Sequence, residues 1–163
     1  MNWQSAPASR NLQKGIFMEQ NENRVYPISA VRVCIDECGD GIKGRIYSKM
    51  RETPLVFRNC SELLLRTDEF FDECGYPQRF QEKRSFRRSE PTGYYARPQI
   101  RLSDSEVLKQ KGECRTMDIL VRSRRRSGWQ GMVMAGDGKP NREFQSEMEL
   151  LDIIKEEIAV SNR

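Results

Sequence analysis

The residues best suited to a chemical role are the arginines of a short basic run at residues 122–127, Arg-Ser-Arg-Arg-Arg-Ser. Guanidinium groups make paired hydrogen bonds to phosphate oxygens, so arginines on a projecting loop suit contact with nucleic acid. Trp129 follows closely and offers a ring on which a base could stack. Charged loop tips can also serve only solubility, and a tryptophan at the start of a strand more often packs on the sheet, which is the interpretation we favour for Trp129.

A second basic segment spans residues 76–101, where Lys and Arg far outnumber Asp and Glu and alternate with tyrosines and phenylalanines. Basic and aromatic side chains in alternation are typical of grooves that hold single-stranded nucleic acid. A solvated linker whose aromatic residues cover the neighbouring core is the alternative. The candidate nucleic-acid contacts of the two segments are Arg79, Lys83, Arg84, Arg87, Arg88, Arg122, Arg124, Arg125, Arg126 and Trp129.

The remaining residue types give little support to catalytic or metal chemistry. The sequence contains no His, which excludes Ser-His and Cys-His triads and every His-containing metal site. Cys34, Cys38, Cys60 and Cys74 could offer four thiolates to zinc, but structural zinc sites usually hold cysteines in paired C-x2-C motifs. Neither of the common glycine-rich phosphate loops occurs. We therefore expect no catalytic residues, no metal and no cofactor, and a small enzyme of unrecognised type is the least favoured function.

Composition and cysteine usage indicate where the protein works. The five cysteines are an odd number in a chain that shows no export signal, so we expect reduced thiols rather than a disulfide framework. The 163 residues are 32% charged and 37% hydrophobic, with a net charge of +4 and a mean hydropathy of −0.77. No apolar run approaches the roughly 20 residues that cross a bilayer. These features predict a cytoplasmic protein that does not enter a membrane.

Periodicity and turn residues predict a first group of elements. Apolar residues alternate with polar ones over residues 28–37, which is the period of a half-buried strand. Turn residues then predict a hairpin with a returning strand at 44–48 and a short third strand at 55–57. Asn59 and Glu62 form a capping box, which predicts that an amphipathic helix follows.

The same order of elements returns after the basic segment. Alternation predicts a strand at 117–122, extended structure at 131–135 and a short strand at 142–144. Ser146 and Glu149 form a second capping box, which begins another amphipathic helix.

The two groups match without a gap at a fixed offset, from Gly41 with Gly128 to Leu64 with Leu151. We therefore expect an α+β fold, with an antiparallel sheet built from two tandem hairpin-strand-helix modules related by a pseudo-twofold axis. Two unrelated pieces that reuse the same turn and cap residues are the alternative. The expected organisation is a flexible tail at 1–27, a first module at 28–75, a basic connector at 76–115 with a short helix at 104–111, and a second module at 116–160.

Residues 128–133, Gly-Trp-Gln-Gly-Met-Val, and residues 144–151, Phe-Gln-Ser-Glu-Met-Glu-Leu-Leu, resemble a C-terminal segment of short uncharacterised proteins from Firmicutes-type bacteria. The likeness covers about a quarter of the chain, and it departs from the pattern where Met134-Ala135 replaces an aromatic residue. It implies a bacterial, cytosolic, compact module and transfers no activity.

These features predict a small non-enzymatic binding or regulatory protein that acts through contact with another protein. Two similar modules bury a joint sheet and leave two similar surfaces, which suits partner binding or a homodimer better than single-site chemistry. The second interpretation is a nucleic-acid-binding accessory protein, or a phage or mobile-element inhibitor of host defence, that contacts RNA or DNA through Arg122–Arg126 and residues 79–101.

Overall fold

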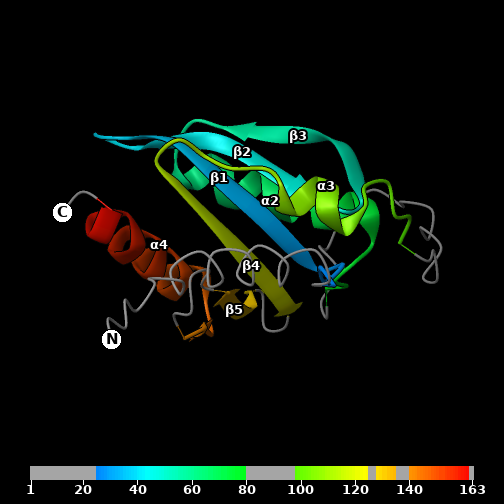
Figure 1. The fold of residues 1–163 in the computed structure, drawn as a ribbon. Helices are drawn as coiled ribbons and strands as arrows, with labels where there is room; N and C mark the ends of the chain where they lie inside the picture. The colour runs from blue at the N-terminus through cyan, green and yellow to red at the C-terminus, as the bar shows by residue number, and fades with distance from the viewer. Residues whose placement is uncertain (1–24, 80–97, 125–127, 135–139, 162–163) are drawn as a thin grey trace, which may run out of the picture.

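A computed structural model of the chain describes residues 25–79, 98–124, 128–134 and 140–161. Within these residues the fold is α+β, with one six-stranded antiparallel sheet and helices on both of its faces (Figure 1). The strands are β1 (Ala30–Cys38), β2 (Ile42–Ser48), β3 (Arg51–Phe57), β4 (Arg115–Ser123), β5 (Gln130–Met134) and β6 (Arg142–Phe144). The helices are α2 (Cys60–Cys74), α3 (Asp104–Leu108) and α4 (Glu147–Ser161).

The strand order across the sheet is β3-β2-β1-β4-β5-β6, and every neighbouring pair is antiparallel. β1 and β4 lie side by side at the centre, where Arg32 faces Asp118 and Val33 faces Met117. β3 and β6 form the two edges among the described strands. The α+β class and the antiparallel sheet expected from the sequence are therefore confirmed.

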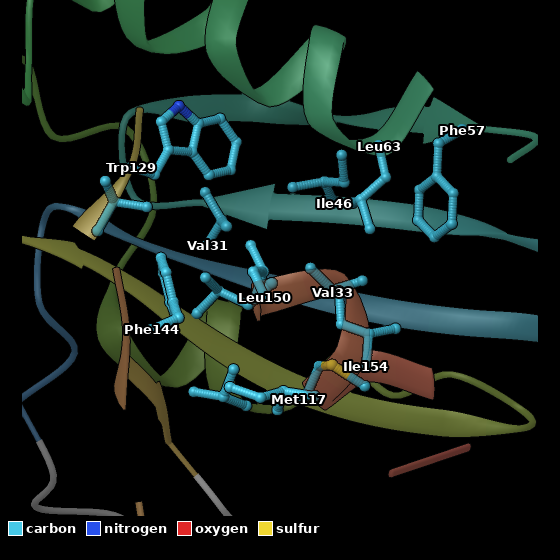
Figure 2. Packing of buried hydrophobic residues seen from close by; sticks show 14 of the residues in the cluster. Val31, Val33, Ile46, Phe57, Leu63, Met117, Trp129, Phe144, Leu150 and Ile154 are labelled. Carbon is cyan, nitrogen blue, oxygen red and sulfur yellow. The ribbon is translucent and has the colours of Figure 1, made fainter. Parts of the chain in front are cut away.

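The main apolar core lies between one face of the sheet and the pair α2 and α4. Alternation along each strand sends every second side chain to this face. α2 lies over β2 and β3, while α4 lies over β5 and β6. Figure 2 shows Leu63 of α2 and Leu150 of α4 reaching the apolar layer that contains Val33 and Met117. Each such buried side chain stabilises the fold by about 1.5 to 3 kcal/mol, so this layer is the main source of stability.

Both long helices begin at the capping residues that the sequence predicts. The Asn59 side chain accepts a hydrogen bond from the Glu62 N–H at 2.8 Å, and the Ser146 hydroxyl accepts one from the Glu149 N–H at 3.2 Å. The two glutamates then accept from the N–H of the residue before each cap, Arg58 and Gln145 respectively. None of the described helices is both long and apolar enough to cross a bilayer.

The opposite face of the sheet carries a smaller core beneath α3. Val107 of α3 is fully buried and packs in a cluster that includes Ala30, Cys34 and Tyr47. The predicted helix at 104–111 is thus present but ends at Leu108, and the described part of the predicted connector packs against the sheet. We call residues 98–114 the α3 strap. Tyr26, which falls within the predicted tail, is also buried in this second core.

Two cysteines differ from the expectation of reduced thiols. Cys38, at the end of β1, forms a disulfide with Cys114, just before β4, while Cys34, Cys60 and Cys74 are free. The two partners are 76 residues apart in the chain, and the pairing of β1 with β4 brings their Cα atoms to 6.3 Å. Because a tertiary contact makes the pair, cysteine spacing alone could not indicate it.

Two glycines allow neighbouring strands to approach closely. A Cβ atom at Gly44 would lie 2.0 Å from the carbonyl oxygen of Cys34, and one at Gly131 would lie 2.0 Å from the carbonyl oxygen of Leu120. Real Cβ atoms essentially never come within 3.0 Å of another heavy atom in this way. Both positions therefore require glycine for reasons of space.

We predict that Gly44→Ala and Gly131→Ala each lower the free energy of unfolding by about 1 to 3 kcal/mol, because the added methyl group overlaps backbone of a paired strand. Gly41→Ala is the matched control, since nothing lies within 4 Å of a Cβ there. Urea denaturation followed by circular dichroism measures all three variants. An equal loss in the control would contradict the close-packing explanation.

Candidate functional site

The predicted nucleic-acid contacts divide into those that the structure describes and those that it does not. Lys83, Arg84, Arg87, Arg88, Arg125 and Arg126 lie outside the described residues. Arg79, Arg122, Arg124 and Trp129 are described, and each of these four contacts another side chain of the protein. Three of them meet at one place on α2.

Two carboxylates on α2 hold this group together. Asp68 and Asp72 are four residues apart, so they project from the same side of the helix, next to its buried stripe. Arg79 forms ion pairs with both, with its Nε 2.8 Å from Asp72. The Arg124 guanidinium also pairs with both and donates a hydrogen bond to the Pro77 carbonyl oxygen at 3.3 Å. We call these two aspartates and two arginines the α2 ion cluster.

Trp129 completes the α2 ion cluster from β5's side. Its indole N–H donates to Asp68 at 3.1 Å, and its ring meets Phe71 of α2 edge-on at a centroid distance of 5.9 Å. The side chain is only 4% exposed, and Figure 2 shows it within the core layer. The favoured interpretation of Trp129 as a packing residue is therefore confirmed.

Arg122 and Arg124 point to opposite faces of the sheet although they are two residues apart on or beside β4. Strict alternation would place both on one face, but the β4–β5 register shifts between Val121 and Ser123. Arg122 therefore pairs with exposed Glu143 on the α3 side, whereas Arg124 enters the core next to α2. The sequence gives no sign that the two arginines differ, because the register shift that separates them arises from the pairing of β4 with β5.

Burial governs the electrostatics of Arg124. Its side chain is 2% exposed, and desolvation lowers its pKa from the ordinary value, an effect opposed by the nearby charge of Asp72 and reinforced by Arg79. The guanidinium still stays charged at any physiological pH. Its Nε makes no hydrogen bond among the described residues. Arg124 thus acts as a structural cation inside the fold and is closed to phosphate.

The backbone also joins these two arginines. Arg79 and Arg124 form an isolated parallel β-bridge. The described chain stops at Arg79 before residues 80–97, and it stops at Arg124 before residues 125–127. Residues 80–97 and residues 125–127 therefore follow neighbouring described residues, which the sequence alone did not indicate.

A second polar group, which the sequence analysis missed, lies under the α3 strap. Asp118 of β4 is 8% exposed and accepts hydrogen bonds from Arg32 of β1 at 3.0 and 3.1 Å and from the Tyr26 hydroxyl at 3.1 Å. Arg32 also donates from Nε to the Gln110 carbonyl oxygen at 2.8 Å. A charged residue within each central strand was the available signal, but only the β1–β4 register shows that the two charges face each other.

Tyr26 and Cys34, which lie near Asp118, are held in their neutral forms. Burial raises the pKa of Tyr26 well above its usual range, with the charge of Asp118 adding to the effect. Burial likewise raises the pKa of the Cys34 thiol to about 11. A protonated thiol and a protonated phenol are poor nucleophiles and poor bases at neutral pH. The polar group around Asp118 is therefore better suited to stabilising the fold than to catalysis.

Metal binding receives no support from the described residues, among which no group of three or more Cys, Asp or Glu side chains is arranged to hold an ion. No protein-family model matches the chain, and searches of curated proteins and of solved structures also found no match. The resemblance to short bacterial proteins stays a prediction. Function must therefore be inferred from the geometry.

We predict that Arg124→Met lowers the free energy of unfolding by about 1 to 3 kcal/mol, because it removes the ion pairs of a buried guanidinium with Asp68 and Asp72 and leaves the carbonyl oxygen of buried Pro77 without this donor. Arg122→Met, two residues earlier and on β4, is the matched control. Its ion pair with Glu143 is half exposed, so its loss should cost less than about 1 kcal/mol. Urea denaturation compares the two variants, and equal losses would contradict the structural role of Arg124.

Proposed function

We propose that this protein is a non-enzymatic binding protein of the bacterial cytoplasm that acts through contact with another protein. The observation that carries the proposal is the open edge of the sheet at β3. The described polar clusters support it indirectly, because their charges are matched within the fold and their thiol and phenol groups are protonated. These groups are thus engaged within the fold, so we look for the function on a surface that can contact another protein.

β3 offers a surface for an incoming strand. It is seven residues long and, among the described strands, pairs only with β2. Val56 on this strand is 55% exposed. Pro54 has no N–H to donate, so a partner strand would pair best beside residues 55–57. We propose that the occupant is an extended segment of a partner protein, which adds to the sheet through main-chain hydrogen bonds.

β6 is the weaker of the two edges, because it has only three residues. Exposed, apolar edge strands attract other strands, and natural proteins usually shorten or charge such edges. β6 is shortened in this way. β3 carries Arg51, Glu52, Pro54 and a register shift in its first part, but residues 55–57 beyond them pair regularly with β2 and include the exposed Val56. The difference favours β3 as the contact edge. A second copy of this chain is an alternative occupant that the experiment below separates.

We further propose that the two halves are one module used twice. Gly44 faces Phe57 and Ile46 faces Leu55, and the same pattern recurs where Gly131 faces Phe144 and Val133 faces Arg142. The registers of both hairpins also shift at matching places, between Ile35 and Glu37 and between Val121 and Ser123.

The register at the centre of the sheet supports the same relation. Ile35 faces Gly44 and Val121 faces Gly131, the counterpart of Gly44, so Arg32, three residues before Ile35, is the counterpart of Asp118, and these two residues face each other. The proposed pseudo-twofold axis therefore passes between these two charged residues. The partners on the axis are opposite in charge, so each half favours the other half over a copy of itself.

A second candidate function, nucleic-acid binding, is favoured by the bridge between Arg79 and Arg124. Because the two described ends are neighbours, the basic residues that follow them start from a common point. Acidic side chains outnumber basic ones among the described residues, so the positive excess of the chain falls in the other segments. In this proposal Arg125, Arg126 and the connector arginines contact phosphate, while Arg124 only supports them.

For the protein-contact proposal, the tagged chain and its Val56→Lys variant are used to capture partners from nuclease-treated lysate of the producing cells. We expect one stoichiometric partner that the Val56→Lys variant loses, because a charge on the edge disfavours strand addition. Leu65→Lys, at a 61% exposed site on α2, is the matched control and should keep the partner. Equal capture by both variants, capture of the chain's own copy alone, or no stoichiometric partner would contradict the proposal.

For the nucleic-acid proposal, Arg125→Glu/Arg126→Glu is compared with Lys109→Glu/Lys155→Glu, which makes the same charge change at exposed sites elsewhere. Fluorescence anisotropy with a labelled oligothymidylate measures affinity across a salt series. We expect binding that weakens steeply with salt, and a slope that falls by about 1.4 only in the arginine variant, since each phosphate contact on single-stranded DNA contributes about 0.7. Arg124 is left intact because its replacement disturbs the fold. Failure of the parent to bind at low salt would eliminate this candidate.

A further inference from the structure

The α3 strap is held to the sheet at both of its ends. At the start of the strap, the N–H groups of Arg101 and Leu102 donate to the Lys49 carbonyl oxygen at 2.7 and 3.0 Å, and Lys49 pairs through its side chain with Asp104. At the other end, the Cys114 N–H donates to the Ile35 carbonyl oxygen at 2.9 Å.

Near its C-terminal end, the strap also makes polar contacts with residues of β1 and β2. Arg45 donates to the Lys111 carbonyl oxygen at 3.1 Å and pairs with Asp36 at 2.8 Å. Asp36 in turn accepts a long hydrogen bond from the Glu113 N–H. These contacts are partly exposed, so each is worth little alone. The Cys38–Cys114 disulfide is the covalent link between the end of β1 and the end of the strap, next to these contacts.

The helix inside the strap cannot form by itself. α3 has five residues, far fewer than the roughly 12 that an isolated helix needs in water. It persists because Val107 is buried against the sheet and the strap is tied down on both sides of it. Beneath Val107 lies Cys34, a free thiol that is 0% exposed. The strap thus covers Cys34, and it stays in place only while its two ends are attached to the sheet.

The disulfide is also open to exchange. Both of its cysteines are only partly buried, unlike Cys34. A disulfide that forms in a reducing compartment is usually transient and redox-sensing, and the composition of this chain favours the cytoplasm. Thiol-disulfide exchange requires access to one sulfur atom, and partly buried cysteines allow this access more readily than fully buried ones.

We propose that the Cys38–Cys114 disulfide is a reducible covalent link that keeps the α3 strap on the sheet. When a dithiol reduces it, the strap separates from the sheet more often and exposes the sheet face around Cys34. In this step the S–S bond breaks, and the two cysteines together gain two electrons and two protons. The dithiol loses the same two electrons and two protons as it becomes a disulfide. This regulation goes beyond the proposed binding functions. It rests on the proposed cytoplasmic location and does not depend on either binding function.

The test uses Cys34 as an internal reporter of strap opening. Full-length protein is oxidised with glutathione disulfide, or reduced with dithiothreitol and desalted, and then labelled with iodoacetamide. Mass spectrometry gives the labelling rate of each free cysteine. We expect the rate at Cys34 to rise about tenfold on reduction, which corresponds to about 1.4 kcal/mol in the opening equilibrium. Cys60 and Cys74, on the helix of the opposite face, should keep their rates.

Cys38→Ser/Cys114→Ser gives an independent reduced state without dithiothreitol. We expect its Cys34 rate to match that of the reduced parent, and if the variant does not fold, the reduced parent alone decides the outcome. Three results would overturn the proposal. They are an unchanged Cys34 rate on reduction, an equal rise at Cys60 and Cys74 that indicates general loosening, and failure of the Cys38–Cys114 disulfide to form under oxidation.

Discussion

The ion pair between Arg32 and Asp118 is the interaction on which the rest of the molecule depends. It joins β1 to β4 at the centre of the sheet, where the first three strands meet the last three. It also holds Tyr26 before β1 and Gln110 in the α3 strap. A buried ion pair gains little over an apolar pair, but loss of one partner leaves an uncompensated charge in the interior. This cost disfavours any strand pairing or register in which the two charges do not meet.

Away from this centre, the C-terminal ends of β1 and β4 are attached to the rest of the fold by different interactions. The end of β1 is linked covalently through Cys38, whereas the residue that follows β4, Arg124, is held by the carboxylates of α2. Both attachments join segments that are distant in sequence. The described arginines, aspartates and cysteines of these attachments thus serve the fold, and partner contact is proposed for the β3 edge and for the basic segments beyond Arg79 and Arg124.

Local features of the structure could be predicted from the sequence, because a few adjacent residues determine them. The caps at Asn59 and Ser146 are examples, since each side chain bonds to a backbone N–H three residues away. The strands of both hairpins followed in the same way from alternation and turn residues. The hairpin-helix order, the α+β class and the antiparallel sheet rested on these local signals.

Features made by distant residues could not be predicted. Arg124 carried the same sequence signal as Arg122, and only the register shift in β4 turns it toward α2. The disulfide and the packing of Val107 likewise require the β1–β4 pairing to exist first. Charge density alone therefore could not place Arg124, because it does not show whether a guanidinium faces solvent or a carboxylate.

A charge exchange at the centre of the sheet tests this account most directly. Arg32→Asp and Asp118→Arg each place like charges opposite one another, and urea denaturation measures the free energy of unfolding of both and of the double variant. The account predicts that each single change costs about 3 kcal/mol or more, and that the exchange recovers at least half of the summed loss. Single changes that are nearly neutral, or an exchange no more stable than the two losses added together, would contradict it.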